Sequence, residues 1–384
     1  MMGVIVLRSV WRRESTLPQG RVDWVDAGKG LAIALVVLFH SARWLAGVAG
    51  DVSGWIWLND VLATMRMPLF FTLAGLFAAK WASVPLAQVW NSKLRLFVWV
   101  FLLWELLGLG PYLLGQTVHG VEINLRREVF DTAISPLVPR FELWFIWALA
   151  LFFLLNRALR GIPAAVTLPV AASVSIVAFT DVLPLPSPSW TGVCKYYVFF
   201  LIGMVGRRAL FSYAARSGWL LRGLVFTGWA ASAWAVTVFD LGRIPGVYPA
   251  LACLGVLAGI AISQVLQRSA LVVRLGSHTL PVYLAHTPIV ILLTAGIALG
   301  ENSEIVRAAA PFLPPVTACV AIALSLGLHR LSTRSPLTFL FDPPRGLLVA
   351  HPADSTSAAR SRQPRVRPAR PEPGEGSSSP KRPG

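Results

Sequence analysis

The stretch that decides how the chain is interpreted is residues 21–45, RVDWVDAGKGLAIALVVLFHSARWL. A polar start with Asp23, Asp26 and Lys29 leads into an apolar run that His40 interrupts. Ionisable side chains are costly to keep inside a membrane helix, so each one is a candidate for function. The stretch is therefore an anchor, part of a transport path, or part of a site where chemistry takes place.

The composition predicts a membrane protein built of helices. The 384 residues are 55% hydrophobic and 14% charged, whereas about a quarter of a soluble domain is charged. The apolar runs are continuous and do not alternate as barrel strands do, which favours helices. The net charge of +16 comes from basic residues in short connections and in the tail. This distribution is typical of membrane topology, and we do not expect nucleic acid as a partner.

Ten apolar segments are each about long enough to cross a hydrocarbon layer of roughly 30 Å. They cover residues 28–46, 55–79, 94–115, 142–159, 162–180, 193–207, 218–239, 247–266, 279–299 and 310–330. An even number of spans places both termini on one side, and the positive-inside rule makes that side the cytoplasm. We therefore expect an all-α integral membrane protein, a bundle of about ten transmembrane helices with both termini cytoplasmic, in the plasma membrane.

The chain is predicted to have three parts. Residues 1–20 form a cytoplasmic N-terminal segment, residues 21–335 the transmembrane domain, and residues 351–384 a basic tail rich in Pro, Arg and Ser. The tail cannot bury an apolar core and is predicted to be disordered near anionic lipid head groups. The connection at 116–141 is either a short interfacial helix or a loop over a cavity. The three cysteines have no paired spacing, so we expect no disulfide framework.

The first segment places a lysine and a histidine on nearly one face. Lys29 and His40 are eleven residues apart, about three helical turns and roughly 16 Å along the axis. Asp26 precedes Lys29 by three residues and can pair with it. Lys29 then lies near the cytoplasmic interface and His40 well inside the membrane. The alternative is an interfacial anchor formed by Asp26 and Lys29, with His40 as a hydrogen-bonded packing residue.

An arginine in the second segment is predicted at a similar depth to His40. Arg66 lies eleven residues into that segment, and Pro68 is predicted to bend or break the helix beside it. An arginine near mid-membrane needs an acid, a carbonyl group or an anionic ligand. Glu105, near the middle of the third segment, is a candidate partner for Arg66 or His40. The alternative is a purely structural role for Arg66.

Two further segments add polar groups. Glu142 stands at the outer start of the fourth segment near Trp144, where it is a candidate site residue or, alternatively, a helix cap within an aromatic belt. Tyr283 and His286 lie three residues apart on one face of the ninth segment. Together with His40 they predict a polar cavity. A metal site is not expected, because no third ligand has metal-binding spacing.

Five stretches of the sequence resemble, in the same order, the acyltransferase 3 family of multi-pass membrane O-acyltransferases, which includes fucose 4-O-acetylase-like proteins. They are WVDAGKGLAIALVVLFHSA, MRMPLFFTLAGLFAAKW, ELWFIWALALFF, KYYVFFLIGMVGRR and HTLPVYLAHTPIVI, within residues 21–335. The resemblance implies a ten-helix domain that moves an acyl group, usually acetyl, from cytosolic acyl-CoA to a hydroxyl. The implied acceptors are a glycan, a lipid-linked sugar or a small hydroxylated molecule. The esterase-like domain of some relatives is not expected.

The family pattern of a basic residue, ten residues and a histidine is matched by Lys29 and His40. The family's paired arginines before the third helix correspond loosely to Lys93 and Arg95, without the RxxR spacing. The resemblance therefore implies that Lys29, Lys93 and Arg95 neutralise the phosphates of acyl-CoA. Acyl-CoA is then a donor substrate, and we expect no permanently bound cofactor.

A hydroxyl needs a positioned base, so we expect His40 to take the acceptor's proton or to carry the acyl group briefly. Arg66 is expected to stabilise the oxyanion or the thioester carbonyl. Asp26, which can pair with Lys29, is assigned to the catalytic residues together with His40 and Arg66.

Five more residues are assigned to substrates. Tyr283 and His286 are expected to line the path of the thioester, and the acceptor is expected to contact Glu105, Glu142 and Trp144. The main alternative is a proton-coupled transporter or flippase, because buried charges and broken helices also suit transport. A non-catalytic membrane scaffold is a third alternative.

Overall fold

The computed structural model describes residues 21–182, 185, 187–300 and 303–344, and every regular element within these ranges is a helix. The described helices all belong to one compact unit. The predictions for residues 1–20 and for the tail at 351–384 lie outside the described residues.

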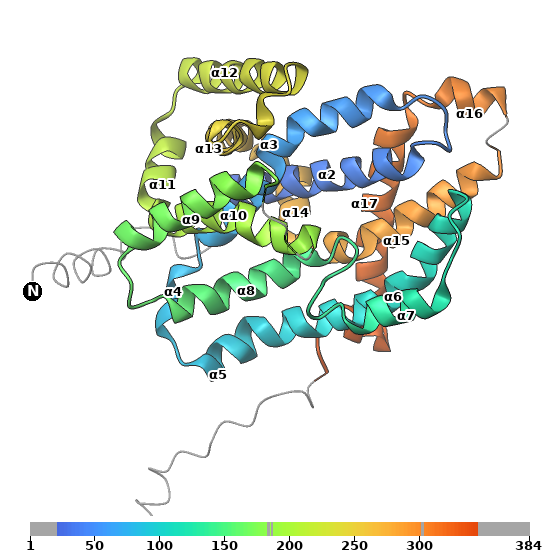
Figure 1. The fold of residues 1–384 in the computed structure, drawn as a ribbon, viewed down its shortest axis with the longest axis horizontal. Helices are drawn as coiled ribbons and strands as arrows, with labels where there is room; N and C mark the ends of the chain where they lie inside the picture. Colours follow the sequence, from blue (N-terminus) through green and yellow to red (C-terminus); the bar gives the residue numbers. More distant parts are fainter. Residues whose placement is uncertain (1–20, 183–184, 186, 301–302, 345–384) are drawn as a thin grey trace, which may run out of the picture. The chain divides into compact units, whose positions relative to one another are not determined.

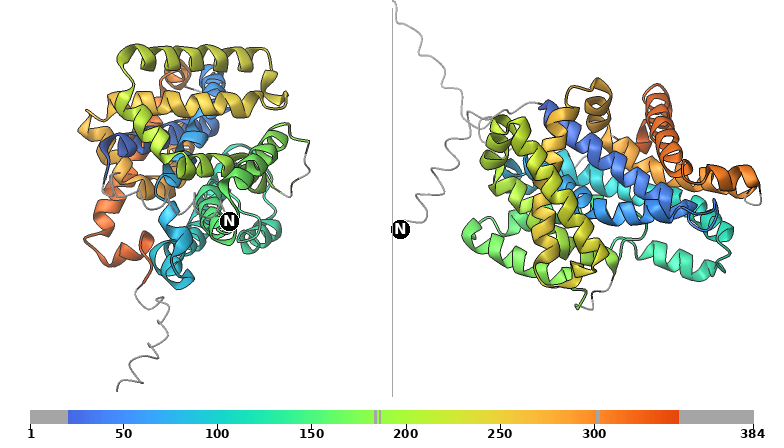
Figure 2. Two further views of the ribbon diagram at one scale, coloured as in Figure 1. Left: turned by 90° about the vertical axis from the view of Figure 1, so that its left-hand side faces the viewer. Right: turned by 90° about the horizontal axis from the view of Figure 1, so that it is seen from above.

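The long helices form a bundle around α2 (Asp23–Leu45), which packs against α3, α13, α14, α15 and α17. The other long helices are α3 (Ser53–Gly75), α6 (Arg95–Val118), α8 (Trp144–Ala158), α9 (Ala164–Phe179), α10 (Pro188–Val205), α12 (Trp219–Val238), α13 (Val247–Leu266), α15 (Thr279–Ala298) and α17 (Leu313–Ser332). Figure 1 shows this arrangement, and Figure 2 shows α12 and α13 side by side at one edge of the bundle.

Short elements mark the two ends of the bundle. The α helices α7 (Leu125–Ala133) and α16 (Glu304–Ala309) lie at one end, and α4 (Ala79–Ser83), α5 (Leu86–Val89) and α11 (Arg207–Arg216) lie at the other (Figure 1). The remaining short elements are α14 (Ala270–Ser277), the π-helix η2 (Trp90–Leu94) and the 3₁₀ helices η3 (Leu241–Arg243) and η4 (Pro336–Leu340). We call the end of the bundle with α7 and α16 the α7 end, and the end with α4, α5 and α11 the α11 end.

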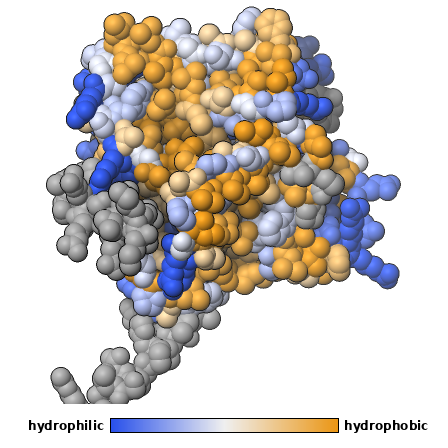
Figure 3. Space-filling model, turned by 60° about the vertical axis from the view of Figure 1, so that its left-hand side comes forward, coloured by the Kyte–Doolittle hydropathy of each residue, from blue (hydrophilic) through white to orange (hydrophobic). Residues whose placement is uncertain are grey.

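Among the described residues, five helical stretches are long and apolar enough to cross a membrane: Asp23–Leu45, Leu86–Val118, Val247–Leu266, Thr279–Ala298 and Leu313–Ser332. Pro188–Val205 and Arg207–Arg216, bent by 72°, make a sixth if they form one span. Many large apolar side chains are exposed, and apolar residues cover most of the face seen in Figure 3. The chain is therefore an all-helical membrane protein. The count of ten spans and the cytoplasmic position of the termini stay predictions.

Pro68 was predicted to bend or break the helix, and the break is wrong, because α3 is continuous from Ser53 to Gly75. Pro68 removes the donor that would serve the carbonyl of Thr64. At that level α13 comes so close that a Cβ atom on Gly255 would lie 2.6 Å from this carbonyl oxygen. The backbone of α13 therefore covers the Thr64 carbonyl, which has no N–H donor from Pro68. Such shielding by a neighbouring helix is what allows a proline inside a membrane helix. Pro281 lies in the first turn of α15, where no helical donor is lost.

The closest backbone approach joins the first turns of α2 to α14. A Cβ atom on Gly276 would lie 1.6 Å from the carbonyl oxygen of Asp26, and one on Gly30 would lie 2.3 Å from that of Val272. Small residues allow such contact between membrane helices, where packing and not the hydrophobic effect drives association. This contact fixes the segment of α2 that carries Lys29.

We predict that Gly276→Ala destabilises the protein by about 1–3 kcal/mol or more, because the added methyl group meets backbone and cannot be accommodated by a side-chain shift. Gly228→Ala on α12 is the matched control, because a Cβ atom there meets nothing within 4 Å. Alanine has a higher helix propensity than glycine, so the control is expected to be neutral or stabilising. Thermal unfolding of both variants in detergent measures the difference, and equal stability would contradict the packing described.

Candidate active site

His40 and Glu142 come together near the α7 end of the bundle. The Nδ1 atom of His40 lies 3.3 Å from Oε1 of Glu142, and 14% and 21% of the two side chains are exposed. The helix-cap alternative for Glu142 is wrong, because α8 begins at Trp144 and has no acidic residue in its first turn. The carboxylate points to the histidine of another helix instead. The geometry pairs the two side chains as an imidazole and a carboxylate.

Tyr283 and His286 complete this polar region from α15. The hydroxyl of Tyr283 donates to the carbonyl oxygen of Glu142 at 2.5 Å and accepts from the backbone N–H of Ile146 at 3.4 Å. The ring centroids of His40 and His286 are 5.2 Å apart. Nδ1 of His286 lies 2.8 Å from the carbonyl oxygen of Tyr283. A carbonyl can only accept, so Nδ1 carries the proton and Nε2 is the acceptor for the Thr287 hydroxyl at 3.1 Å.

Arg66 is a buried cation held by neutral groups. Its side chain is among the buried residues at 6% exposure, Nη1 donates to Oδ1 of Asn59 at 3.3 Å, and the guanidinium stacks over the Phe39 ring at 4.4 Å. The Asn59 amide is fixed in turn by its bond to the carbonyl of Trp55 at 2.8 Å. Within the described ranges, no carboxylate lies at ion-pair distance from Arg66. The guanidinium borders a cavity and is oriented without being neutralised.

That cavity has a volume of about 250 Å³ and lies between α2, α3, α8, α10 and α15. His40, Arg66, Glu142 and Tyr283 all line it, together with apolar and aromatic side chains. A wider, open groove of about 1010 Å³ adjoins it at the α7 end. We call it the Arg140 groove. It is lined by His40, Tyr112, Pro139, Arg140, Phe141, Glu142, Trp144, Asp181, Leu185, Ser187, Pro188, Ser189, Thr191, Gly192, Lys195 and Tyr196. The two spaces share His40, Glu142, Trp144 and Tyr196, so a ligand in the groove can reach the histidine.

Lysines gather near the α11 end around two aromatic rings. Lys29 lies 6.0 Å from the centroid of Phe77, and Lys80 and Lys93 lie 5.0 Å and 5.5 Å from that of Trp81. Lys93 is within electrostatic range of both Lys29 and Lys80. We call these three residues the lysine cluster. Their like charges favour an anionic ligand at this end of the bundle.

The remaining predicted residues take different positions. Asp26 is buried and contacts Lys29 at 3.6 Å and Arg21 at 3.0 Å, so it neutralises part of the lysine cluster. The Nε and Nη1 atoms of Arg95 are buried and have no hydrogen-bond partner among the described residues. Trp144 stacks near Tyr196, with ring centroids 6.0 Å apart.

The contact predicted for Glu105 with His40 or Arg66 is not made, since Glu142 and Asn59 take these places. Glu105 is buried in α6 instead, within electrostatic range of Arg140 and Glu142.

Sequence reasoning missed several residues of these sites, among them Asn59, Lys80 and Tyr196. Asn59 lies seven residues before Arg66, two turns along the same helix face, so its spacing was a usable signal. Lys80 follows the second segment directly, but nothing in the sequence pairs it with Lys93. Tyr196 lies within a stretch of aromatic residues that gives no indication of which ring faces the cavity.

The comparisons with known proteins agree with this architecture. Residues 22–330 match a family model, Acyl_transf_3, described as an acyltransferase domain. The chain is also 22% identical over 357 residues to the inner membrane protein YcfT of Escherichia coli strain K12, which covers 84% of this chain and 96% of the relative. No solved structure matches the chain significantly.

The predicted topology places the Arg140 groove outside and the lysine cluster inside. We test this with Thr191→Cys in the groove and Ser83→Cys in the exposed end of α4, in a background with the three native cysteines replaced by serine. An impermeant maleimide added to sealed right-side-out vesicles is expected to label Thr191→Cys at once. It should label Ser83→Cys only after permeabilisation. Labelling of both from one side would disprove the topology.

Proposed function

The chain belongs to the acyltransferase 3 family, and on that premise we propose that it moves an acetyl group from acetyl-CoA to a sugar hydroxyl. We further propose that it does so in the plasma membrane, with both termini in the cytoplasm. The observation that carries the proposal is the His40–Glu142 pair, which lies where the cavity and the Arg140 groove meet. A membrane acyltransferase needs a base at a point that both substrates reach.

His40 is the proposed general base. The Glu142 carboxylate faces Nδ1, and this contact leaves Nε2 to take the proton of the acceptor hydroxyl. The acceptor oxygen then bonds to the thioester carbon, the carbon–sulfur bond breaks, and the proton passes from His40 to the leaving thiolate. The carboxylate orients the ring and stabilises the imidazolium that forms between these two transfers. Tyr283 lines the cavity that the thioester is proposed to enter, and His286 is buried beside His40 and Tyr283 behind it.

Arg66 is the proposed stabiliser of the oxyanion. A buried cation without a carboxylate partner is costly, and a developing negative charge in the cavity offsets that cost. Asn59 and Phe39 hold the guanidinium in place before the reaction, so little reorganisation accompanies charge development. The same cavity wall carries His40, which places base and electrophile around one small volume.

The donor is proposed to enter at the α11 end. The lysine cluster, together with Arg95, supplies positive charge for the phosphates of acyl-CoA, and Asp26 fixes Lys29. From Lys29 to His40 the helix rises roughly 16 Å, a span that the extended arm of CoA can bridge. The thioester then reaches His40 from the opposite end to the Arg140 groove.

The acceptor is proposed to occupy the Arg140 groove. Its aromatic rings, including Trp144 and Tyr196, suit the apolar face of a sugar ring, and its polar residues suit the hydroxyls. Glu142 belongs to both the groove and the base pair, and Glu105 on α6 lies within electrostatic range of Glu142 and Arg140. Charged and hydroxyl side chains around a wide opening fit a glycan or lipid-linked sugar better than a lipid chain.

We predict that His40→Ala lowers acetyl transfer by about 10²-fold or more, the contribution of a positioned base. The assay follows thiol release from acetyl-CoA and radiolabelled acetyl incorporated into envelope saccharides. His119→Ala is the matched control, because His119 contacts the carbonyl group and the ring of Trp44 and does not line the cavity or the groove. A folded His40→Ala protein with wild-type turnover would refute the mechanism, and wild-type protein without thiol release would favour a transporter.

We also predict that Lys29→Met/Lys93→Met raises the KM for acetyl-CoA about tenfold with little change in kcat. The lost contacts to phosphate are charge-assisted hydrogen bonds, and they are equal in the ground and transition states. Arg216→Met, an exposed arginine at the end of α11, controls for a general loss of positive charge. An unchanged KM would place the CoA phosphates elsewhere.

A further inference from the structure

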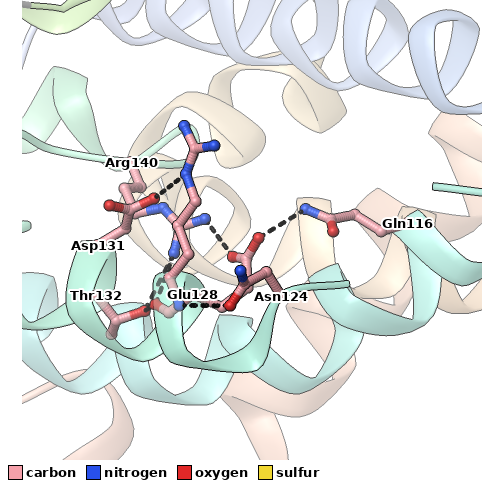
Figure 4. Close-up of polar contacts among 7 residues, drawn as sticks. Gln116, Asn124, Glu128, Asp131, Thr132 and Arg140 are labelled. Atoms are coloured by element: carbon pink, nitrogen blue, oxygen red, sulfur yellow. Dashed lines mark hydrogen bonds and ion pairs between the residues drawn. The ribbon is translucent and has the colours of Figure 1, made fainter. Parts of the chain in front are cut away.

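The chain between α6 and α8 reaches Glu142 through a short helix and an irregular segment. The helix is α7, and residues 134–143 follow it without forming a helix that continues into α8. Figure 4 shows polar side chains of this connection turned toward one another around Glu128 and Arg140. The arrangement matters because Glu142 follows Arg140 by two residues.

Arg140 makes a set of directed bonds back to α7. Its guanidinium forms an ion pair with the Glu128 carboxylate and donates to the Glu128 carbonyl oxygen at 3.0 Å and to Oγ1 of Thr132 at 3.3 Å (Figure 4). Gln116 of α6 donates to the other Glu128 oxygen at 3.4 Å. Only 16% and 11% of the Arg140 and Glu128 side chains are exposed, so solvent weakens the pair little. We call this pair the Glu128–Arg140 clamp.

The residue between Arg140 and Glu142 has an unusual backbone. Phe141 has φ = 46°, in the left-handed region that a bulky side chain adopts only where its surroundings hold it. Its ring lies 4.6 Å from that of Tyr112, and the Arg140 guanidinium lies 5.1 Å from its centroid. The turn that aims Glu142 at His40 is therefore held by contacts on its N-terminal side.

The flanking segments are anchored separately. Trp147, Trp190 and Ser189 donate to the carbonyls of residues 136, 137 and 139 at 3.0, 2.9 and 2.9 Å. On the other side, the Tyr283 hydroxyl binds the carbonyl of Glu142. These bonds fix the path of the connection on both sides of the turn, and the clamp adds the contacts of the Arg140 side chain itself.

We propose that Arg140 is a positioning residue: its clamp to Glu128 holds the turn at Phe141 so that the Glu142 carboxylate faces Nδ1 of His40. This inference rests on the proposed function, in which Glu142 orients the base. A buried ion pair is a poor source of stability, and an apolar pair of similar volume serves folding as well. A guanidinium fork differs from an apolar pair because it fixes direction as well as distance.

The test removes the clamp without leaving a buried charge unpaired. Glu128→Met/Arg140→Met replaces both partners, and Arg127→Met/Asp131→Met is the matched control. The control pair lies on the same helix at 3.7 Å, with Arg127 largely exposed. With acetyl-CoA and envelope saccharides, we expect the clamp variant to lose at least tenfold in kcat. The KM for acetyl-CoA and the unfolding temperature should stay near those of the wild type, and the control should match the wild type throughout.

A second comparison separates positioning from a general structural role. Residues that act through one another have non-additive effects on turnover. In a Glu142→Gln background, removing the clamp is therefore expected to cause little further loss. Two results would overturn the proposal. One is a combined variant whose fold loss in kcat equals the product of the losses caused by Glu142→Gln and by removal of the clamp, and the other is a clamp variant with wild-type kcat. If the double methionine variant folds poorly, Arg140→Lys, which keeps the charge but loses the fork, gives the same comparison.

A readout without turnover distinguishes failure of the clamp from failure of the proposed function. Carbethoxylation of His40 by diethylpyrocarbonate, followed by mass spectrometry, reports how firmly the ring is held. We expect it to accelerate severalfold in the clamp variant and to stay unchanged in the Arg127→Met/Asp131→Met control. Unchanged reactivity in the clamp variant overturns the positioning role. If the wild-type protein transfers no acetyl group but carbethoxylation of His40 is still faster in the clamp variant, the positioning role of the clamp is supported and only the proposed function is refuted.

Discussion

Polar groups inside an apolar bundle need partners, and this requirement shapes the centre of the molecule. His40 faces Glu142, Tyr283 caps the Glu142 carbonyl, and Arg66 is held by Asn59. Asn59 and Arg66 lie on the same helix, α3, but His40, Glu142 and Tyr283 come from α2, the connection before α8, and α15. These three elements must therefore pack in one arrangement to bring the groups together. The site and the packing around α2 are therefore two results of the same constraint.

The fold was largely predictable because its signal is local. Long apolar runs specify helices whatever their tertiary neighbours, and each of the predicted segments overlaps a long helix. The sequence did not show that the helix continues through Pro68 without a break, and the reason is different. Whether a proline breaks a membrane helix depends on the helix packed beside it, here α13 at Gly255, and one segment's sequence does not contain that information. For the same reason the sequence left the 116–141 connection open between a helix and a loop, and it contains α7.

The sequence predicted which residues belong to the site better than it predicted which of them contact one another. His40, Arg66 and Tyr283 stand out because ionisable or phenolic groups are rare in such segments, and the cavity does bring them together. Glu105 and Glu142 were harder to separate, because both are acids near a helix that bears His40. Depth along a helix gave one coordinate only. Two further features decide that Glu142 and not Glu105 faces the imidazole: the azimuth of α2 and α6, and the path of the connection that carries Glu142. Both follow from packing around the whole bundle.

Adjacent residues of the connection before α8 have two roles, lining the groove and contacting His40. Arg140 and Phe141 line the groove, and Glu142 lines the groove and also meets the histidine. Surface connections usually vary freely between relatives, but here a change in length would turn the carboxylate away from its imidazole. Divergence of ligand preference in such a protein must therefore proceed by substitution at constant length in this stretch, or move to other residues that line the groove, such as Ser187 and Thr191.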